Sequence, residues 1–287
     1  MAGPSEWGGG VNPHAAPAVS PVDMVRSLWS HRRLLGQLSR REVASRYKGA
    51  AMGVAWSFIT PMLMLAVYTF VFSVVFKARW GSESAPESNA QFAIIMFVGI
   101  VVHGLFAEVV NRAPSLILGN VNYVKKVVFP LEILPGVVMS SALFHMCVSL
   151  LVLFGAMLFI NGTLSWTTIF LPIVVLPLMI FTLGLAWFLA ALGVFLRDVS
   201  QVTSILTMIM LFLAPVFYPI SAIPEKYRWL IMANPLTFII EQAREVVIWG
   251  HFPNFAGLAA YSAIALAVAW LGFVWFQKTR KGFADVL

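Results

Sequence analysis

Ionisable side chains inside long apolar runs are the first candidates for chemistry in this sequence. His103, Glu108 and Arg112 fall within or at the edge of one such run, and His145 lies in the next. If these runs cross a membrane, ionisable residues in them are functional candidates by default, because charge is costly there. A structural role is the alternative. Glu108 and Arg112 have the i,i+4 spacing of an ion pair, and the two histidines could bond each other or a backbone carbonyl.

The motifs of common catalytic centres are absent from the sequence. It has no GxxxxGK[ST] phosphate loop, no HExxH pair, no Cys/His cluster and no GxSxG turn. These motifs supply phosphate-binding, metal-binding and nucleophilic groups. We therefore expect no catalytic residue, no metal ion and no cofactor bound by this chain. The argument is weaker against an enzyme embedded in the membrane.

The composition indicates a polytopic membrane protein. Of the 287 residues, 60% are hydrophobic and 11% are charged, and the mean hydropathy is +0.87. Soluble domains carry about 25% charged residues. The net charge of +7 fits basic residues on cytoplasmic loops, so we expect no nucleic-acid partner.

Six apolar runs approach or exceed the length of about 20 residues that crosses a bilayer as a helix. They cover residues 54–76, 92–110, 133–160, 167–195, 199–217 and 255–276. Placing both chain ends in the cytoplasm puts 14 of the 19 Lys and Arg residues on that side. The sequence therefore predicts an all-α membrane protein with six transmembrane helices and cytoplasmic N- and C-termini.

The segments outside these runs have their own patterns. Residues 1–20 are rich in Gly, Ala and Pro and are expected to form a flexible tail. Residues 21–53 carry two apolar stripes interrupted at His31, which indicates two amphipathic helices on the cytoplasmic membrane surface. An ordinary solvated basic flank is the alternative. The stripes consist of Val22, Val25, Leu28 and Trp29, and of Leu34, Leu35 and Leu38.

An outer helical hairpin is expected over residues 218–254, which are too polar to span a membrane. Pro224 opens the first helix, Asn234 and Pro235 start the second, and Gly250 ends it. The hairpin either re-enters the bilayer or lies on its outer surface. The second helix has an apolar face of Leu236, Ile239, Ile240, Ala243, Val246 and Val247, and its polar residues Glu241, Gln242, Arg244 and Glu245 are expected elsewhere.

Aromatic residues are abundant near the first and fifth runs. Such rings can stack on the apolar faces of sugars, and lipid contact or packing is the alternative. The candidates are Trp56, Tyr68, Phe72, Phe212 and Phe217.

Several stretches resemble a known family. They include LSRREVASRYKGAAMGVAWSFITPM at 38–62, NVNYVKKVVFPLEILPG at 120–136 and the FxRDxxQ pattern of Phe195, Arg197, Asp198 and Gln201. APVFYP at 214–219 and NPLT at 234–237 follow. Together they resemble the membrane subunit (permease) of ABC-type polysaccharide exporters, which serve O-antigen, capsular polysaccharide and teichoic acid export. The resemblance covers residues from about 35 to the end.

The resemblance implies a single six-helix transmembrane domain over 54–287 and gate helices within 21–53. It implies that the loop 120–129 docks on a separate ABC ATPase subunit, which binds ATP and Mg. Tyr123, Lys125 and Lys126 are the candidate coupling residues. Arg197 and Asp198 are read as either a coupling pair or a structural pair.

The resemblance also implies a channel between helices one and five of two copies, with the aromatic candidates along its wall. A cytoplasmic rim of Arg40, Arg41, Arg46 and Lys48 would meet the phosphate of a lipid-linked substrate. Positive-inside topology alone would also explain that rim. The outer hairpin would lie near the exit, with Tyr218, Trp229, Glu241 and Arg244 as gate candidates.

The expected function is that of a multi-pass permease in the bacterial inner membrane, moving a lipid-linked polysaccharide, most closely an O-antigen. Its expected partners are a second copy of itself, two ABC ATPase subunits, the lipid-linked polysaccharide and membrane lipids. Capsular polysaccharide, teichoic acid and a smaller lipid or drug are alternative substrates. A stand-alone channel is disfavoured because midplane carboxylates and inverted repeats are lacking. A lipid-glycan enzyme is disfavoured because no acidic or His cluster is present.

Overall fold

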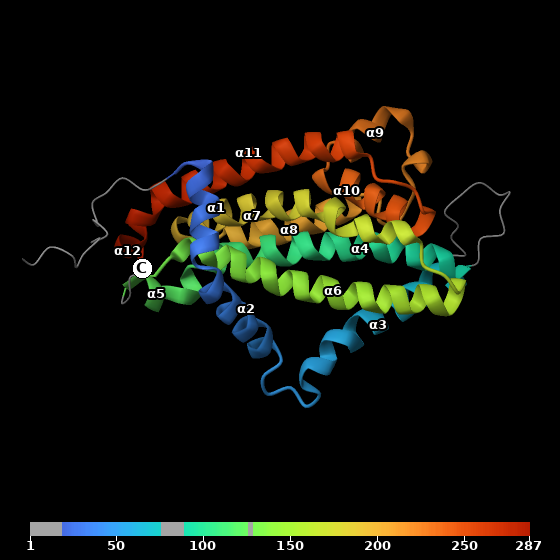
Figure 1. Cartoon of the computed structure of the whole chain (residues 1–287), viewed down its shortest axis with the longest axis horizontal. Coiled ribbons are helices and arrows are strands. Elements are labelled where there is room, and N and C mark those ends of the chain that lie inside the picture. The colour runs from blue at the N-terminus through green and yellow to red at the C-terminus, as the bar shows by residue number, and fades with distance from the viewer. Residues whose placement is uncertain (1–18, 76–88, 126–128) are drawn as a thin grey trace, which may run out of the picture.

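A computed structural model describes residues 19–75, 89–125 and 129–287, and every regular element in these ranges is helical. Figure 1 shows long helices running side by side along the molecule, with α2 and α3 forming a V on one side. The all-α prediction is confirmed. The predicted tail over 1–20 lies outside the described residues except for its last two.

Long helices form the bundle, and shorter elements connect them. The long ones are α3 (Trp56–Tyr68) with its π-helical continuation η2 (Thr69–Val75), α4 (Asn89–Arg112), α6 (Leu134–Asn161), α7 (Leu171–Phe195), α8 (Val199–Leu213) and α11 (Phe255–Thr279). The N-terminal and outer helices are α1 (Pro21–Ser30), α2 (Arg32–Arg46), α9 (Glu225–Met232), α10 (Pro235–Arg244) and the π-helix η8 (Glu245–Trp249). The remaining short elements are η1 (Gly53–Ala55), η3 (Ala113–Ser115), η4 (Leu118–Asn120), α5 (Val121–Lys125), η5 (Leu131–Ile133), η6 (Trp166–Phe170), η7 (Ile220–Ala222), η9 (Arg280–Gly282) and α12 (Phe283–Val286).

Five helical segments in the described ranges are long and apolar enough to cross a membrane. They are Gly53–Phe72, Gln91–Ser115, Leu131–Ile160, Trp166–Phe195 and Phe255–Val286. Each corresponds to one of the six predicted runs.

The fifth predicted run departs from expectation, because its helix α8 ends at Leu213 instead of continuing to Phe217. At 1.5 Å per residue its 15 residues span about 22 Å, less than the roughly 30 Å of a hydrocarbon core. Pro215 is the cause. It lacks an N–H donor and pushes the preceding Ala214 into an extended conformation, with φ −90° and ψ 152°.

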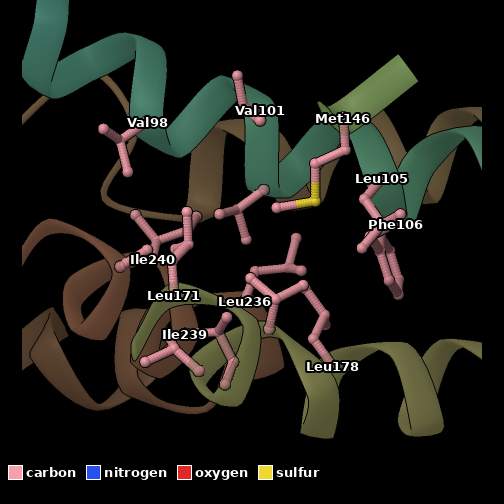
Figure 2. Close-up of a cluster of buried hydrophobic side chains, with 14 of the residues drawn as sticks. Val98, Val101, Leu105, Phe106, Met146, Leu171, Leu178, Leu236, Ile239 and Ile240 are labelled. Carbon is pink, nitrogen blue, oxygen red and sulfur yellow. The ribbon is translucent and has the colours of Figure 1, made fainter. Parts of the chain in front are cut away.

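The hydrophobic core is built around α4. Within the protein, 78% of the apolar stretch of α4 is buried, against 11% for that of α3. Figure 2 shows Val98, Val101, Leu105 and Phe106 of α4 beside side chains from three other helices. The labelled neighbours are Met146 of α6, Leu171 and Leu178 of α7, and Leu236, Ile239 and Ile240 of α10. These four helices therefore form one packed unit.

Helices α7 and α11 approach so closely that their backbones touch. A Cβ atom added to Gly272 would lie 2.1 Å from the carbonyl oxygen of Gly184. Only glycine fits this crossing, so the two residues fix how α7 and α11 pack.

The exposed surfaces of α3 and α8 are strongly apolar. Met62 of α3 and Phe70 of its continuation η2 are 57% and 61% exposed, and Val202 and Phe212 of α8 are 61% and 60% exposed. No described part of the chain covers these side chains. Lipid or another protein surface must do so.

The two predicted N-terminal helices are present, and the chain breaks between them at His31. A capping box of Ser20 and Asp23 starts α1, and the Ser20 hydrogen bonds lower the pKa of the Asp23 carboxyl. In the first stripe Val22, Val25 and Trp29 are exposed, whereas Leu28 packs on the bundle near Gly136. The second stripe also packs on the bundle, because Leu35 lies over Gly136 of α6.

The two helices that the sequence predicts within residues 218–254 are present, as α9 and as α10 with its continuation η8. The Asn234 side chain accepts a hydrogen bond from the N–H of Leu236 at 3.0 Å, and Gly250 ends η8 with φ +73°. The apolar face of α10 and η8 is buried throughout. The expectation for Arg244 is wrong, because its side chain is 1% exposed and lies in the protein interior.

Candidate functional site

A charged cluster joins α2, α4 and α6 at one end of the bundle. Its centre is the Glu108 carboxylate on α4. Arg46 Nη1 of α2 lies 2.6 Å from Glu108 Oε1, and His145 Nδ1 of α6 lies 2.8 Å from Oε2. Arg112 Nη1 lies 3.6 Å from Oε1 and also pairs with Glu42 of α2. Two acidic and two basic side chains of α2 and α4 are therefore matched, and His145 joins them from α6.

Burial explains why the cluster needs all these partners. The Glu108 side chain is 16% exposed, and a carboxylate removed from water is stable only when paired and hydrogen-bonded. The predicted pair with Arg112 exists, but two of the partners come from other helices. His145 bonds Glu108 and not His103, whose Nε2 instead lies 2.9 Å from the carbonyl oxygen of Thr207.

Sequence reasoning missed Glu42 as a member of this cluster. Glu42 and Arg46 have i,i+4 spacing on α2, which would have suggested a pair between them. Each instead reaches across to α4. Within the described residues, no group of three or more His, Cys, Asp or Glu side chains could hold a metal ion.

A cavity of about 300 Å³ opens beside the cluster, between α3, α4 and α6. Arg46, Tyr47, Glu108 and His145 line it at the charged cluster, and most of its wall is apolar. Trp56, a channel candidate, also lines this cavity.

The coupling candidates Tyr123 and Lys125 both contact other parts of the same chain. The Tyr123 ring stacks on Phe129 with centroids 4.3 Å apart, and Lys125 Nζ bonds the backbone oxygen of Leu287. Lys126 lies outside the described residues. Arg197 and Asp198 are both exposed in the turn before α8 and form no ion pair in the described part of the chain.

The rim candidates divide into two kinds. Arg46 is held by Glu108, whereas Arg40, Arg41 and Lys48 are exposed. Within the ranges that the structure describes, these last three side chains have no acidic partner. They are the ones that remain available to an anion.

Three of the channel aromatics come together, although they lie far apart in the sequence. Phe72 stacks on Phe217 with ring centroids 5.9 Å apart, and Phe217 lies 5.7 Å from Phe212. Tyr68 is half-buried on α3, and Trp56 lies at the start of that helix.

Of the outer gate candidates, Trp229 is exposed and Tyr218 is half-buried, while Arg244 is a buried cation. Arg244 Nε donates to the Ile95 carbonyl at 3.1 Å, Nη2 to the Val216 carbonyl at 3.2 Å and Nη1 to the Glu241 carboxylate at 2.8 Å. Burial lowers its pKa to about 10, so the guanidinium stays charged at neutral pH. It ties α10 to α4 and to the segment after α8.

Comparison with known proteins places this architecture in a family. The family model described as ABC-2 type transporter matches residues 33–248. The chain belongs to the ABC-2 type transporter membrane family. The match includes α2, α4 and α6, and so every member of the charged cluster.

Relatives of this permease carry names of polysaccharide transport. The O-antigen export system permease protein RfbA of Myxococcus xanthus is 30% identical, over 92% of this chain and 99% of that protein. RfbA of Klebsiella pneumoniae is 28% identical, over 88% of this chain and 95% of its own. The polysialic acid transport protein KpsM of Escherichia coli is 22% identical, over 84% and 91%. Two of these relatives are thus named as export permeases and the third as a transport protein.

Removing the Glu108 charge should loosen the attachment of α2. Glu108→Gln leaves Arg46 and Arg112 facing a neutral amide, and we expect a loss of about 1–3 kcal/mol of stability, read as a lower Tm of the purified permease. Glu225→Gln is the matched control, because Glu225 is 90% exposed and lies 3.7 Å from Arg228. An equal shift of Tm in both variants would contradict a special role for Glu108.

Arg244→Lys should destabilise the outer end although it retains the positive charge. A lysine ammonium cannot replace the planar guanidinium, which donates hydrogen bonds to three acceptors. We therefore expect a loss of about 1–3 kcal/mol in the free energy of unfolding. The control is Arg228→Lys, whose side chain is 41% exposed. Thermal unfolding of both variants is the measurement, and an unchanged Tm for Arg244→Lys would show that the guanidinium is unnecessary.

Proposed function

We propose that this ABC-2 permease exports a lipid-linked polysaccharide, most closely an O-antigen, across the bacterial inner membrane. Two copies form the channel, and two ABC ATPase subunits bind them from the cytoplasm and supply ATP and Mg. Similarity to the O-antigen export permease of Myxococcus xanthus over 92% of this chain is the observation that carries the proposal. The name of the Escherichia coli relative makes polysialic acid, or a related polymer, the second candidate substrate.

A second copy would cover the apolar surfaces of α3 and α8. Both helices expose large side chains that no described segment of the same chain buries. The Phe72, Phe217 and Phe212 rings contact one another, and the exposed Phe212 ring offers an aromatic face to a sugar polymer. This supports a homodimer whose path runs along α3 and α8.

Six crossings with cytoplasmic termini remain the proposed topology. Helix α8 is short, so the irregular residues 214–219 would have to complete the fifth crossing. Non-helical backbone is tolerated at membrane depth only when protein buries and satisfies it. Ala214, Pro215 and Val216 are buried, and Arg244 bonds the Val216 carbonyl, which is the support this topology needs. On this topology the hairpin of α9 and α10 is re-entrant at the outer end.

Energy would reach the bundle through two cytoplasmic elements. ATP binding closes the ATPase dimer and moves α5 and the rest of the loop 120–129, together with α1 and α2. The cluster around Glu108 links α2 directly to α4 and α6, so motion of α2 would be felt by the central helix. Arg197 and Asp198, both exposed, would face the same partner.

The first experiment is a gentle purification of the tagged permease from its native membrane, with an ATP hydrolysis assay. We expect a co-purifying ABC ATPase and vanadate-sensitive hydrolysis. The variant Lys125→Ala/Lys126→Ala should lose the partner, because the coupling loop loses its basic contacts, while Lys226→Ala on α9 should keep it. A preparation without partner or hydrolysis, under conditions that preserve such complexes, would refute the proposal.

The phosphate rim has a separate test. Arg40→Gln/Arg41→Gln should lower polysaccharide export about tenfold, the effect of losing roughly 1.4 kcal/mol of charge-assisted binding. Arg26→Gln/Arg33→Gln removes the same charge from the same membrane side and should export normally. Surface polysaccharide and membrane insertion are measured together. Normal export by the Arg40/Arg41 variant would contradict phosphate binding by these arginines. Their positive charge would then serve only to orient the protein in the membrane.

A further inference from the structure

The cavity between α3, α4 and α6 is a groove with one helical stripe on each side. Along α4 its lining runs from Phe97 through Val101 and Gly104 to Glu108, the i,i+3/i+4 spacing of one face. At 1.5 Å per residue this stripe is about 16 Å long. Figure 2 shows Val101, Leu105 and Met146, three side chains of its wall.

The groove changes from polar to apolar along its length. Arg46, Tyr47, Glu108 and His145 line the charged end, whereas Pro61, Met64, Phe97 and Ile100 line the rest. The Nε2 atom of His145 is buried without a hydrogen-bond partner among the described residues. The polar end therefore retains a hydrogen-bonding group that the described part of the chain does not use.

The size of the groove fits one hydrocarbon chain. Its volume of about 300 Å³ is at the lower limit of small-molecule sites, which suits a short stretch of one hydrocarbon chain. Gly104 is exposed on an otherwise buried stretch of α4, and a Cβ atom added there would meet nothing within 4 Å. The absence of a side chain at Gly104 therefore keeps the groove open.

One cation without an acidic partner in the described residues adjoins the polar end of the groove. Lys48 is exposed and directly follows Tyr47, which lines that end. The Arg46 guanidinium on the other side of Tyr47 is held by Glu108 at 2.6 Å, so the two charges offset each other. An ammonium next to the end of an apolar groove matches a phosphate attached to a hydrocarbon chain.

We propose that this groove binds the phosphate-proximal part of the hydrocarbon chain of a single-chain lipid phosphate. The hydrocarbon chain lies against α3, α4 and α6, and the phosphate sits beside Lys48. The identity of this lipid as the substrate's lipid end rests on the proposed function, but the binding site itself does not. The groove would then hold the lipid end while the sugar portion moves along another path.

Photolabelling of the permease in its native membranes tests the site without requiring transport or ATP. The probe is a polyprenyl phosphate carrying a diazirine on its chain near the phosphate, and labelled peptides are identified by mass spectrometry. We expect label on peptides that contain the groove residues of α3, α4 and α6. A diacyl phosphatidylglycerol with a diazirine in one acyl chain is the comparison probe.

Filling the groove with a side chain should reduce this labelling. We expect Gly104→Leu to lower it about tenfold, which corresponds to displacing about two buried methylene groups, and Gly104→Ala to lower it less. Gly155→Leu is the matched control, because Gly155 lies exposed on α6 outside the groove and an added Cβ there also meets nothing within 4 Å. Unchanged Tm for the three variants shows that each is folded.

Two results would overturn the proposal. Labelling that is insensitive to Gly104→Leu would show that the chain does not enter the groove. Equal, Gly104-dependent labelling by the diacyl probe would show an ordinary phospholipid site and not one for a single-chain lipid phosphate. Neither result depends on co-purification of an ATPase, so failure here differs from failure of the proposed function.

Discussion

The buried carboxylate of Glu108 is the constraint on which one end of the helix bundle depends. A charge with 16% exposure must find partners or lose stability, and here the partners come from α2, α4 and α6. The leucine stripe of α2 packs on α6 near Gly136, and the ion pairs add a second attachment to α4. With it, α2 is held on α4, the most deeply buried helix, and the turn from α2 into α3 starts from a fixed point.

Arg244 meets a comparable requirement at the other end of the bundle. Pro215 interrupts α8 and leaves backbone carbonyls that no helix can satisfy. The guanidinium bonds the carbonyls of Val216 and Ile95 and the carboxylate of Glu241, so one side chain joins three segments. Both ends of the bundle are thus organised by a buried charge with partners from other helices, while the middle is held by apolar packing and by the contact of Gly184 with Gly272.

Several surfaces of this chain are apolar and remain exposed in the described structure. The apolar surfaces of α3 and α8, the exposed stripe of α1 and the groove at Gly104 all call for something outside the described chain. Membership in the ABC-2 family gives a reason for this incompleteness, because a permease subunit works with partners and in lipid. Each surface has a different chemistry: flat and apolar on α3 and α8, amphipathic on α1, and graded from charged to apolar in the groove.

The sequence by itself determined the membrane class, five of the long helices, the two N-terminal helices, the hairpin and its caps, and the family. These features depend on local properties, namely hydropathy summed over a run, helix periodicity and the chemistry of Asn, Pro and Gly at helix ends. Only the tertiary structure decided that Arg46 and His145 meet Glu108, that Arg244 lies inside, that Phe72 meets Phe217, and that α8 stops short. The partner of a buried charge is chosen by which helices pack together, and residues as distant as Arg46 and Glu108 carry no local pattern that reveals it.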